Sequence, residues 1–259
     1  MNQSNSLEAV IFDLDGVITL TARVHAAAWQ ELFDGFLKER AEQHDLPFHP
    51  FDLNADYQRY VDGKPRIDGV LSFLVSRNIQ IRLGDTSDSP SLNTAWGLAN
   101  RKNELFKRKL QQMGVEVDHE AVEFVRELRS RGVRTGLASS SKNALLVLEK
   151  ANLGSLFDAV TEGLTSERLH LKGKPEPDIF LHCLEELNPQ ATPLEAAVVE
   201  DAISGVAAAK RGGFGLVLGV DRCKTGDLLL HGADWVIGTF QEITADQFIQ
   251  RFRSLTKAA

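Results

Sequence analysis

Three short apolar runs stand out along the chain, and a polar residue follows each of them. The runs, each with that polar residue, are Leu7–Phe12 before Asp13, Val133–Ala138 before Ser139, and Ala196–Val199 before Glu200. Short apolar runs of this kind are typical of strands covered on both faces, as in a parallel sheet. The pattern therefore predicts buried parallel strands with polar side chains at their carboxyl ends.

Helix-like stretches alternate with these runs. They are Glu120–Arg131, Asn143–Ala151, Pro177–Glu186 and Ile203–Arg211. Gly132, Gly154 and Gly212 lie near three of their ends, where a left-handed cap favours glycine. The alternation of strands and helices predicts an α/β fold, with a doubly wound parallel sheet as its core.

The stretch between the first run and the second breaks this alternation. It contains three predicted helices, Ala26–Arg40, Ile67–Arg77 and Thr94–Met113, and a polar connection, Gly84–Asn93. The simplest interpretation is an α-helical cap domain inserted into the core. We expect residues 1–21 and 115–259 to form the core, and residues 22–114 to form the cap.

Composition narrows the functional class. The net charge of −7 argues against non-specific binding to nucleic acid or to an anionic membrane. It leaves room for a small anionic substrate, because one cleft can hold a local positive potential. Met1–Glu8 has no pattern of a secretory signal, and no apolar run approaches the roughly 18 residues that span a bilayer. Cys183 and Cys223 form no disulfide or zinc pattern, so we expect a cytoplasmic protein without thiol catalysis.

Asp13 and Asp15 are the first candidate catalytic pair. A spacing of two places both carboxylates on the same side of an extended chain. One carboxylate could attack phosphorus while the other protonates the leaving oxygen. Gly16 would allow a sharp turn after them. The structural alternative is a pair of acids that ends a strand and caps a turn.

Two further candidates could bind a phosphate. Ser139 starts the run Ser139–Asn143, where a hydroxyl and backbone amides at a helix start could bind an anion. The alternative is an ordinary serine N-cap. Lys174 precedes Pro177, a residue suited to a first helical turn, and could offer a point charge. The alternative for Lys174 is a solvated surface lysine.

Glu200 and Asp201 follow the third run. Together with Asp13 they could supply the oxygen ligands that Mg²⁺ prefers. The alternative is an acidic N-cap that stabilises a helix dipole. Each site has such an alternative, but all four fall at predicted strand ends, where a doubly wound sheet binds its ligands. Their convergence favours one catalytic site.

The order of these motifs resembles the haloacid dehalogenase superfamily over nearly the whole core. The motifs are the D-L-D-G at Asp13, the serine at a strand end, the K-P-x-P-D at Lys174 and the E-D at Glu200. Closer detail resembles its β-phosphoglucomutase branch, through Asp13–Thr19 with Thr21, His25 and Trp29, through Ala138–Asn143, and through Lys174–Phe180. The resemblance implies an enzyme with a Rossmann-like core and a cap.

The resemblance also implies roles for the core residues. Asp13 would be the nucleophile and Asp15 the general acid and base. Mg²⁺ would be bound by Asp13, the backbone carbonyl of Asp15, and Asp201, with Glu200 in support. Ser139 and Lys174 would hold the transferring phosphoryl group. Residues expected to face the substrate are Ser140, Lys142 and Asn143.

In the cap, the resemblance implies that Thr21 and His25 belong to the hinge and assist proton transfer at Asp15. Asp62–Arg66 resembles the specificity loop, in which Gly63 and Arg66 would bind the substrate, with Arg66 on the distal phosphate of the sugar. The branch has a lysine where Asp62 stands, a departure that bears on the sugar. The alternatives are a structural His25, a core Trp29 and a surface Arg66.

Three functions follow from these expectations. The first is a mutase that converts β-glucose 1-phosphate to glucose 6-phosphate. The second is a sugar-phosphate phosphatase. It is favoured by the departure at Asp62 and by a cap that is longer than the branch's, with the polar insertion Gly84–Asn93. The third is a non-enzymatic phospho-receiver or sugar-phosphate sensor, against which the paired acids and the large cap argue. We expect a monomer or weak homodimer whose partner is a small sugar phosphate, with no nucleic acid or membrane partner.

Overall fold

The computed structural model describes residues 6–256 of the chain, so most of Met1–Glu8 lies outside the described residues. The chain divides into two compact units. One, the core unit, comprises the described parts of Met1–Leu20 and Glu116–Ala259, and the other, the inserted unit, comprises Thr21–Val115. The domain boundaries expected from the sequence lie between residues 21 and 22 and between residues 114 and 115. The catalytic role assigned to the core and the specificity role assigned to the cap remain predictions.

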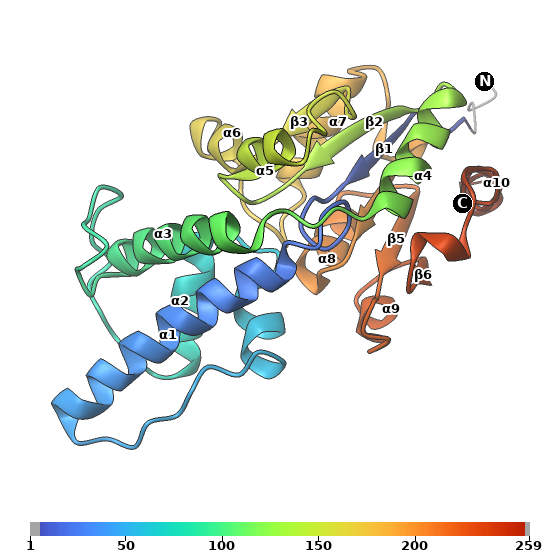
Figure 1. The fold of residues 1–259 in the computed structure, drawn as a ribbon. Coiled ribbons are helices and arrows are strands. Elements are labelled where there is room, and N and C mark those ends of the chain that lie inside the picture. Colours follow the sequence, from blue (N-terminus) through green and yellow to red (C-terminus); the bar gives the residue numbers. More distant parts are fainter. Residues whose placement is uncertain (1–5, 257–259) are drawn as a thin grey trace. The chain divides into compact units, whose positions relative to one another are not determined.

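The core unit is built on one parallel sheet of six strands, in the order β3-β2-β1-β4-β5-β6 (Figure 1). The strands are β1 (Ala9–Phe12), β2 (Arg134–Ala138), β3 (Ala159–Thr161), β4 (Ala196–Glu200), β5 (Leu216–Val220) and β6 (Trp235–Ile237). The chain winds outward from β1 in both directions, so the order reverses between β1 and β4. This is the predicted doubly wound α/β fold, and the reversal is where such sheets bind ligands.

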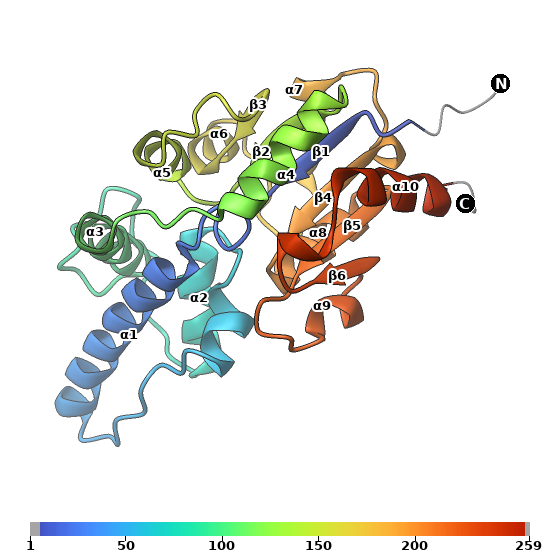
Figure 2. The same ribbon diagram turned by 45° about the vertical axis from the view of Figure 1, so that its right-hand side comes forward.

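Helices cover both faces of this sheet. Those of the core unit are α4 (His119–Ser130), α5 (Ala144–Lys150), α6 (Gly163–Arg168), α7 (Asp178–Leu187), α8 (Ile203–Arg211), α9 (Asp227–Leu230) and α10 (Ala245–Thr256), with 3₁₀ turns at Pro193–Glu195 and Phe240–Glu242. Figure 2 shows α4 and α10 lying together across one face of the sheet. The four helices predicted in this unit are all present, and each end lies within one residue of the predicted one.

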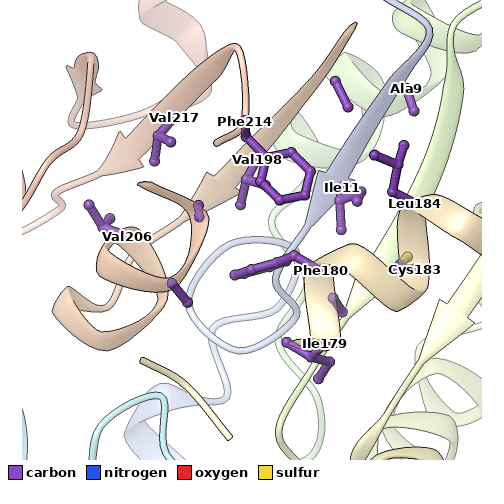
Figure 3. Close-up of a cluster of buried hydrophobic side chains, with 14 of the residues drawn as sticks. Ala9, Ile11, Ile179, Phe180, Cys183, Leu184, Val198, Val206, Phe214 and Val217 are labelled. Atoms are coloured by element: carbon purple, nitrogen blue, oxygen red, sulfur yellow. The ribbon is translucent and has the colours of Figure 1, made fainter. Parts of the chain in front are cut away.

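The strand β1 shows why its sequence has no polar alternation. Ala9 and Ile11 face a buried cluster that includes Phe180 of α7 (Figure 3). Phe12 points to the other face, where its ring lies 6.3 Å from that of Phe124 in α4. Because successive strand side chains point to opposite faces, a strand covered on both sides is apolar throughout.

Two of the three predicted glycine caps are wrong in position. Gly132 has the expected left-handed backbone, with φ of 79°. After α5, however, Asn152 takes this conformation instead of Gly154, and after α8 it is Gly213, while Gly212 has φ of −70°. In each case the left-handed residue is the second after the last helical one, the position where a helix is capped in this way.

The inserted unit is helical, as predicted. It contains α1 (Ala22–His44), a π-helix (Tyr57–Val61), α2 (Arg66–Ser76) and α3 (Ala95–Met113). Trp29 is buried and its ring stacks on that of Phe33 at 5.3 Å, which confirms the core interpretation for this tryptophan. Within the polar connection Gly84–Asn93, the carbonyl oxygens of Thr86 and Asp88 accept from the Asn100 side chain of α3 at 3.0 and 2.9 Å.

No helix in the described range 6–256 is long and apolar enough to span a bilayer. Cys183 is fully buried on α7, and burial raises the pKa of its thiol to about 12. The thiolate is the reactive form, so this cysteine is structural. Cys223 is exposed, and both thiols are free.

Candidate active site

The carboxyl ends of β1, β2 and β4 bring the predicted core residues to one edge of the sheet. Phe12 of β1 is in register with Leu137 of β2 and Val199 of β4. The following residues, Asp13, Ala138 and Glu200, therefore continue these three strands side by side. The Asp13 amide donates to the Val199 carbonyl at 2.9 Å and fixes the first carboxylate at the point where the strand order reverses.

A tight loop follows Asp13. The Asp15 amide donates to Asp13 Oδ2 at 2.9 Å, and the Gly16 amide donates to the Thr19 carbonyl at 2.6 Å. The amides of Ile18 and Thr19 both donate to the Leu14 carbonyl, at 3.0 and 2.9 Å. Residues 13–19 thus form a closed turn, referred to below as the acidic loop, which holds its two aspartates in a fixed relation.

Lys174 is a buried cation between two carboxylates. Its side chain is 0% exposed, and Nζ lies 2.5 Å from Asp13 Oδ1 and 2.5 Å from Glu200 Oε1. Nζ also lies 4.8 Å above the ring centre of Phe180. This position overturns the surface-lysine alternative, because a solvated lysine would not be enclosed in this way.

The three charges in this cluster do not balance, since two carboxylates share one ammonium. Burial raises the pKa of Asp13 to about 7, with Lys174 opposing the rise and Glu200 and Asp15 adding to it. Burial also acts to lower the pKa of Lys174, but the two carboxylates outweigh it and hold that pKa above its ordinary value. Lys174 therefore stays charged, and one excess negative charge remains for a further cation to neutralise once Asp13 has lost its proton.

Two glycines make room for the acids that follow β4. A Cβ atom at Gly16 would lie 1.8 Å from Asp201 Oδ2, so the Asp201 carboxylate is packed against the acidic loop. A Cβ atom at Gly205 would lie 1.8 Å from Glu200 Oε1. Glu200 Oε2 also accepts from the Ala202 amide at 2.7 Å. Both Glu200 oxygens are thus occupied by contacts within the protein, whereas the Asp201 carboxylate faces the acidic loop.

The donors suit a Mg²⁺ site completed by substrate. Among residues 6–256, no group of three or more His, Cys, Asp or Glu side chains has the arrangement of a metal cage. Mg²⁺ commonly takes only one or two protein carboxylates and fills its other positions with water and phosphate oxygens. Asp13 and Asp201, with the excess negative charge around Lys174, fit that pattern.

Hydrogen bonds between serine side chains and nearby backbone amides hold the serine-rich segment after β2. Ser139 is buried, and its Oγ accepts from the Ser141 amide at 3.1 Å. Ser141 Oγ accepts in turn from the Asn143 amide at 3.2 Å. Lys142 Nζ pairs with Glu167 Oε1 at 2.6 Å. α5 begins at Ala144 with Asn143 as its N-cap residue, so the serine N-cap alternative is wrong for Ser139. The roles of Ser139, Ser140, Lys142 and Asn143 toward a phosphate or sugar stay predictions.

In the inserted unit, His25 lies in a polar cluster that sequence reasoning missed. Its Nδ1 is 2.7 Å from Lys102 Nζ, and its ring lies 4.1 Å from that of Phe106. Lys102 is buried on α3, with Nζ 4.8 Å from the ring centre of Trp29. Its position in an apolar stripe was the available signal, because the buried residues of α3 recur three and four apart. Apart from Gly97, these are Ala95, Leu98, Ala99, Lys102, Leu105, Phe106 and Leu110.

Thr21 and the expected specificity loop belong to the same unit. Thr21 is the N-cap residue of α1, and its carbonyl accepts from the His25 amide at 3.0 Å. Gly63 has φ of 66°, and Arg66 is the first residue of α2. Lys64 Nζ donates to the Arg59 carbonyl at 3.0 Å, so it braces the loop against the π-helix. The substrate-binding roles of Gly63 and Arg66 stay predictions.

Three comparisons with known proteins agree on the family. The family model described as haloacid dehalogenase-like hydrolase matches residues 7–213. A β-phosphoglucomutase of Mycobacterium tuberculosis is 42% identical over 241 residues, which are 92% of this chain and 91% of the relative. A phosphorylated carbohydrates phosphatase of Thermotoga maritima is 30% identical over 217 residues, 83% of this chain and 85% of that protein.

The fold agrees with the same group of proteins. A crystal structure of β-phosphoglucomutase from Clostridium difficile superposes with a TM-score of 0.75 at 24% identity, and the match covers 98% of this chain and all of that one. At this level of identity the likeness is one of fold. It bears out the prediction of an α/β core of the haloacid dehalogenase type with an inserted unit.

Proposed function

The chain belongs to the haloacid dehalogenase-like hydrolases, as an enzyme of the phosphomutase or phosphohydrolase type, and from that premise we propose that it transfers a phosphoryl group on a small sugar phosphate. Asp13 is the proposed nucleophile, and the intermediate is a phospho-aspartate on its side chain. The observation that carries this proposal is the buried Lys174, held between Asp13 and Glu200 at the edge where the sheet order reverses.

Charge is the main obstacle to this reaction, because a carboxylate must approach a phosphate dianion. At about 4 Å and an effective dielectric constant near 20, two like unit charges repel by roughly 4 kcal/mol. Lys174 offsets part of this repulsion from a fixed position. Since it is already desolvated and held by two carboxylates, it need not reorganise when the phosphoryl group arrives.

Mg²⁺ is the proposed cofactor. Asp13, the backbone carbonyl of Asp15, and Asp201 would bind it, and Glu200 would support the site through its bonds to Lys174 and Ala202. When bound, Mg²⁺ would neutralise the charge that spreads over the phosphoryl oxygens. The protein holds Asp13 through the Val199 carbonyl and holds Asp201 against Gly16.

Asp15 is the proposed general acid and base. It would protonate the bridging oxygen as the sugar leaves, and later take a proton from the hydroxyl that attacks the phospho-aspartate. The Asp15 amide is fixed on Asp13 Oδ2, which sets the spacing between nucleophile and acid. Thr21 and His25 are proposed to assist this proton transfer, and Lys102 to orient His25.

We propose β-phosphoglucomutase as the specific activity, converting β-glucose 1-phosphate to glucose 6-phosphate. Support comes from the 42% identical relative of that name and from Gly63 and Arg66, which match the expected specificity loop. Ser139 and Lys174 would hold the transferring group, while Arg66 would bind the distal phosphate through its forked donors.

Incubation with β-glucose 1-phosphate, Mg²⁺ and a trace of glucose 1,6-bisphosphate tests this activity. We expect glucose 6-phosphate as the main product, and no turnover by Asp13→Asn, whose carboxamide is a poor nucleophile of nearly the same shape. The fold of that variant is checked by circular dichroism. Near wild-type turnover by Asp13→Asn would remove the phospho-aspartate mechanism, and absence of glucose 6-phosphate would remove the mutase.

A sugar-phosphate phosphatase is the second candidate. Asp62 stands where the mutase branch has lysine, and the carbohydrate phosphatase of Thermotoga maritima is 30% identical. Inorganic phosphate as the main product from a panel of sugar phosphates would favour this function. Failure to release any phosphate across the panel would dismiss it.

A further inference from the structure

Arg222 lies on the loop after β5 and contacts two segments that are far apart in the sequence. Its Nε donates to the Gly16 carbonyl at 3.1 Å, and Nη2 donates to Asp118 Oδ2 at 2.6 Å. Nη2 also lies 3.5 Å from the Val17 carbonyl. The Arg222 side chain is 29% exposed and that of Asp118 is 8% exposed, so this ion pair is largely shielded from water.

The two segments that Arg222 contacts are paired with each other. The Leu20 amide donates to the Glu116 carbonyl at 2.9 Å, and the Asp118 amide donates to the Ile18 carbonyl at 3.0 Å. The chain leaves the core unit after Leu20 and re-enters it at Glu116. Arg222 therefore holds the core-unit side of both connections at once.

The first of these segments is the end of the acidic loop. Gly16, whose carbonyl Arg222 holds, follows Asp15 directly and has φ of 94°. The Asp201 carboxylate lies against the same glycine. A rotation of the Gly16–Val17 peptide would thus disturb both the acid on its N-terminal side and the acid packed against it.

Asp118 connects this arrangement to α4. Its Oδ1 accepts from the Ala121 amide at 2.9 Å and caps the helix, while Oδ2 binds Arg222. A guanidinium presents several donors in a rigid plane, so it can hold a carbonyl and a carboxylate together, which a single ammonium cannot reproduce. The residue type therefore matches the geometry.

We propose that Arg222 is a positioning residue for phosphoryl transfer, which fixes the acidic loop and the two chain connections to the core unit. This inference rests on the proposed function. It assigns Arg222 no contact with substrate. Its effect is to keep Asp15 at the correct distance and angle for proton transfer, while Lys174 and Asp13 keep their own contacts.

The test uses the full chain with Arg222→Gln, Arg222→Lys and Asp118→Asn. Asparagine retains the N-cap acceptor for Ala121 and removes the charge pair. Arg131→Gln is the control, because the Arg131 side chain is 31% exposed, close to that of Arg222, and pairs with the exposed Asp246 elsewhere on the core unit. Steady-state turnover of the sugar phosphate and backbone hydrogen exchange are measured for every variant, well below its melting temperature.

We expect Arg222→Gln to lower kcat by about tenfold or more with KM changed less than about threefold, since small misplacement of a catalytic group costs up to about a hundredfold. Arg222→Lys should recover part of the loss, and Asp118→Asn should lose less than Arg222→Gln. Hydrogen exchange at Ile18 and Thr19 should rise in Arg222→Gln, with β2 and β4 unchanged. Arg131→Gln should leave both measurements unchanged.

An unchanged kcat in Arg222→Gln would overturn the inference, and so would faster exchange across the whole sheet, because that marks a merely structural role. The proposed function fails separately, if the wild-type chain turns over no sugar phosphate. In that case the exchange measurement still decides whether Arg222 holds the acidic loop, and unchanged exchange at Ile18 and Thr19 would refute it.

Discussion

At the scale of single residues, Gly16 is the position where the site tolerates least change. Gly16→Ala would place a methyl group 1.8 Å from Asp201 Oδ2 in a backbone conformation with φ of 94°. We expect the displaced Asp201 and acidic loop to lower turnover by about a hundredfold or more. The measurement is kcat with saturating Mg²⁺ and sugar phosphate.

Gly132→Ala is the matched control for this change. Gly132 also has a left-handed backbone, with φ of 79°, but nothing lies within 4 Å of the Cβ position. It should cost about 1 kcal/mol of stability through backbone strain and leave turnover unaltered. Equal losses of turnover in the two variants would show that strain alone, rather than contact with Asp201, explains Gly16.

Lys174 gives the second prediction at this scale. Lys174→Met leaves Asp13 and Glu200 buried without their shared cation, and removal of one partner from a buried pair costs about 3 kcal/mol or more. Without Lys174, which opposes the rise in its pKa, the Asp13 carboxyl would hold its proton still more tightly when folded than when unfolded. The loss of stability should therefore be largest near pH 8 and shrink toward pH 5, as Asp13 is protonated.

Urea unfolding of the metal-free protein across this pH range measures the effect. Lys210→Met is the control, because the Lys210 side chain is 52% exposed and pairs with Asp234 at 2.8 Å. That variant should lose little stability at any pH. A Lys174→Met protein as stable as wild type at pH 8 would contradict the account of the cluster.

At the scale of elements, strands and helices with long apolar patterns were predictable, and short ones were not. The runs that became β1, β2 and β4 were found because each is a short, mostly apolar segment followed by a polar residue. β3 and β6 have three residues each and are held by their neighbours in the sheet, so they carry no periodicity of their own. β5 has the same apolar character as β4 and could have been identified by the same argument.

The candidate site divides in the same way. Asp13 and Glu200 were predictable, since strand ends at one sheet edge must meet, and Lys174 was predicted from the K-P-x-P-D motif before α7. Lys102 and Arg222 were not recognised, because their importance depends on contacts with residues 77 and more than 200 positions away. The π-helix Tyr57–Val61 also escaped prediction, since one added residue in a turn leaves no clear mark on an apolar pattern.

The pairing of α1 with α3 leads to a prediction about Lys102. Lys102→Met replaces a buried cation with an apolar chain of similar length, next to Trp29 and Phe106. Because exchange of a buried charge for a packed apolar group is often neutral or stabilising, the melting temperature should hold or rise. Turnover should fall by about tenfold, since His25 loses the group that orients it.

Lys109→Met is the control for Lys102, because Lys109 lies on the same helix and pairs with Glu31 of α1 at 2.7 Å. It should retain full turnover. A marked loss of stability in Lys102→Met, with turnover unchanged, would assign Lys102 a structural role in helix packing and would remove it from the proton-transfer group.

At the scale of the whole molecule, the two cysteines offer a way to follow the core unit alone. Both lie within Glu116–Ala259, and the inserted unit Thr21–Val115 has none. Cys223 is exposed, whereas Cys183 is 0% exposed on α7 and donates to the Leu137 carbonyl of β2. The environment of Cys183 therefore depends on the packing of α7 against the sheet.

A thiol reagent such as Ellman's reagent should label one cysteine per native chain and the second only when the core unit unfolds. Two causes act together, since Cys183 is closed to the reagent and burial raises the pKa of its thiol to about 12, which suppresses the reactive thiolate. Cys223→Ser should show almost no labelling in the native state.

In a urea series, labelling of Cys183 should follow the unfolding of the sheet even where helical signal from the inserted unit is lost earlier. Native-state labelling of Cys183 as fast as that of Cys223 would mean that α7 opens from the sheet without unfolding of the core unit. The view that α7 holds Lys174 rigidly in the active site would then have to be abandoned.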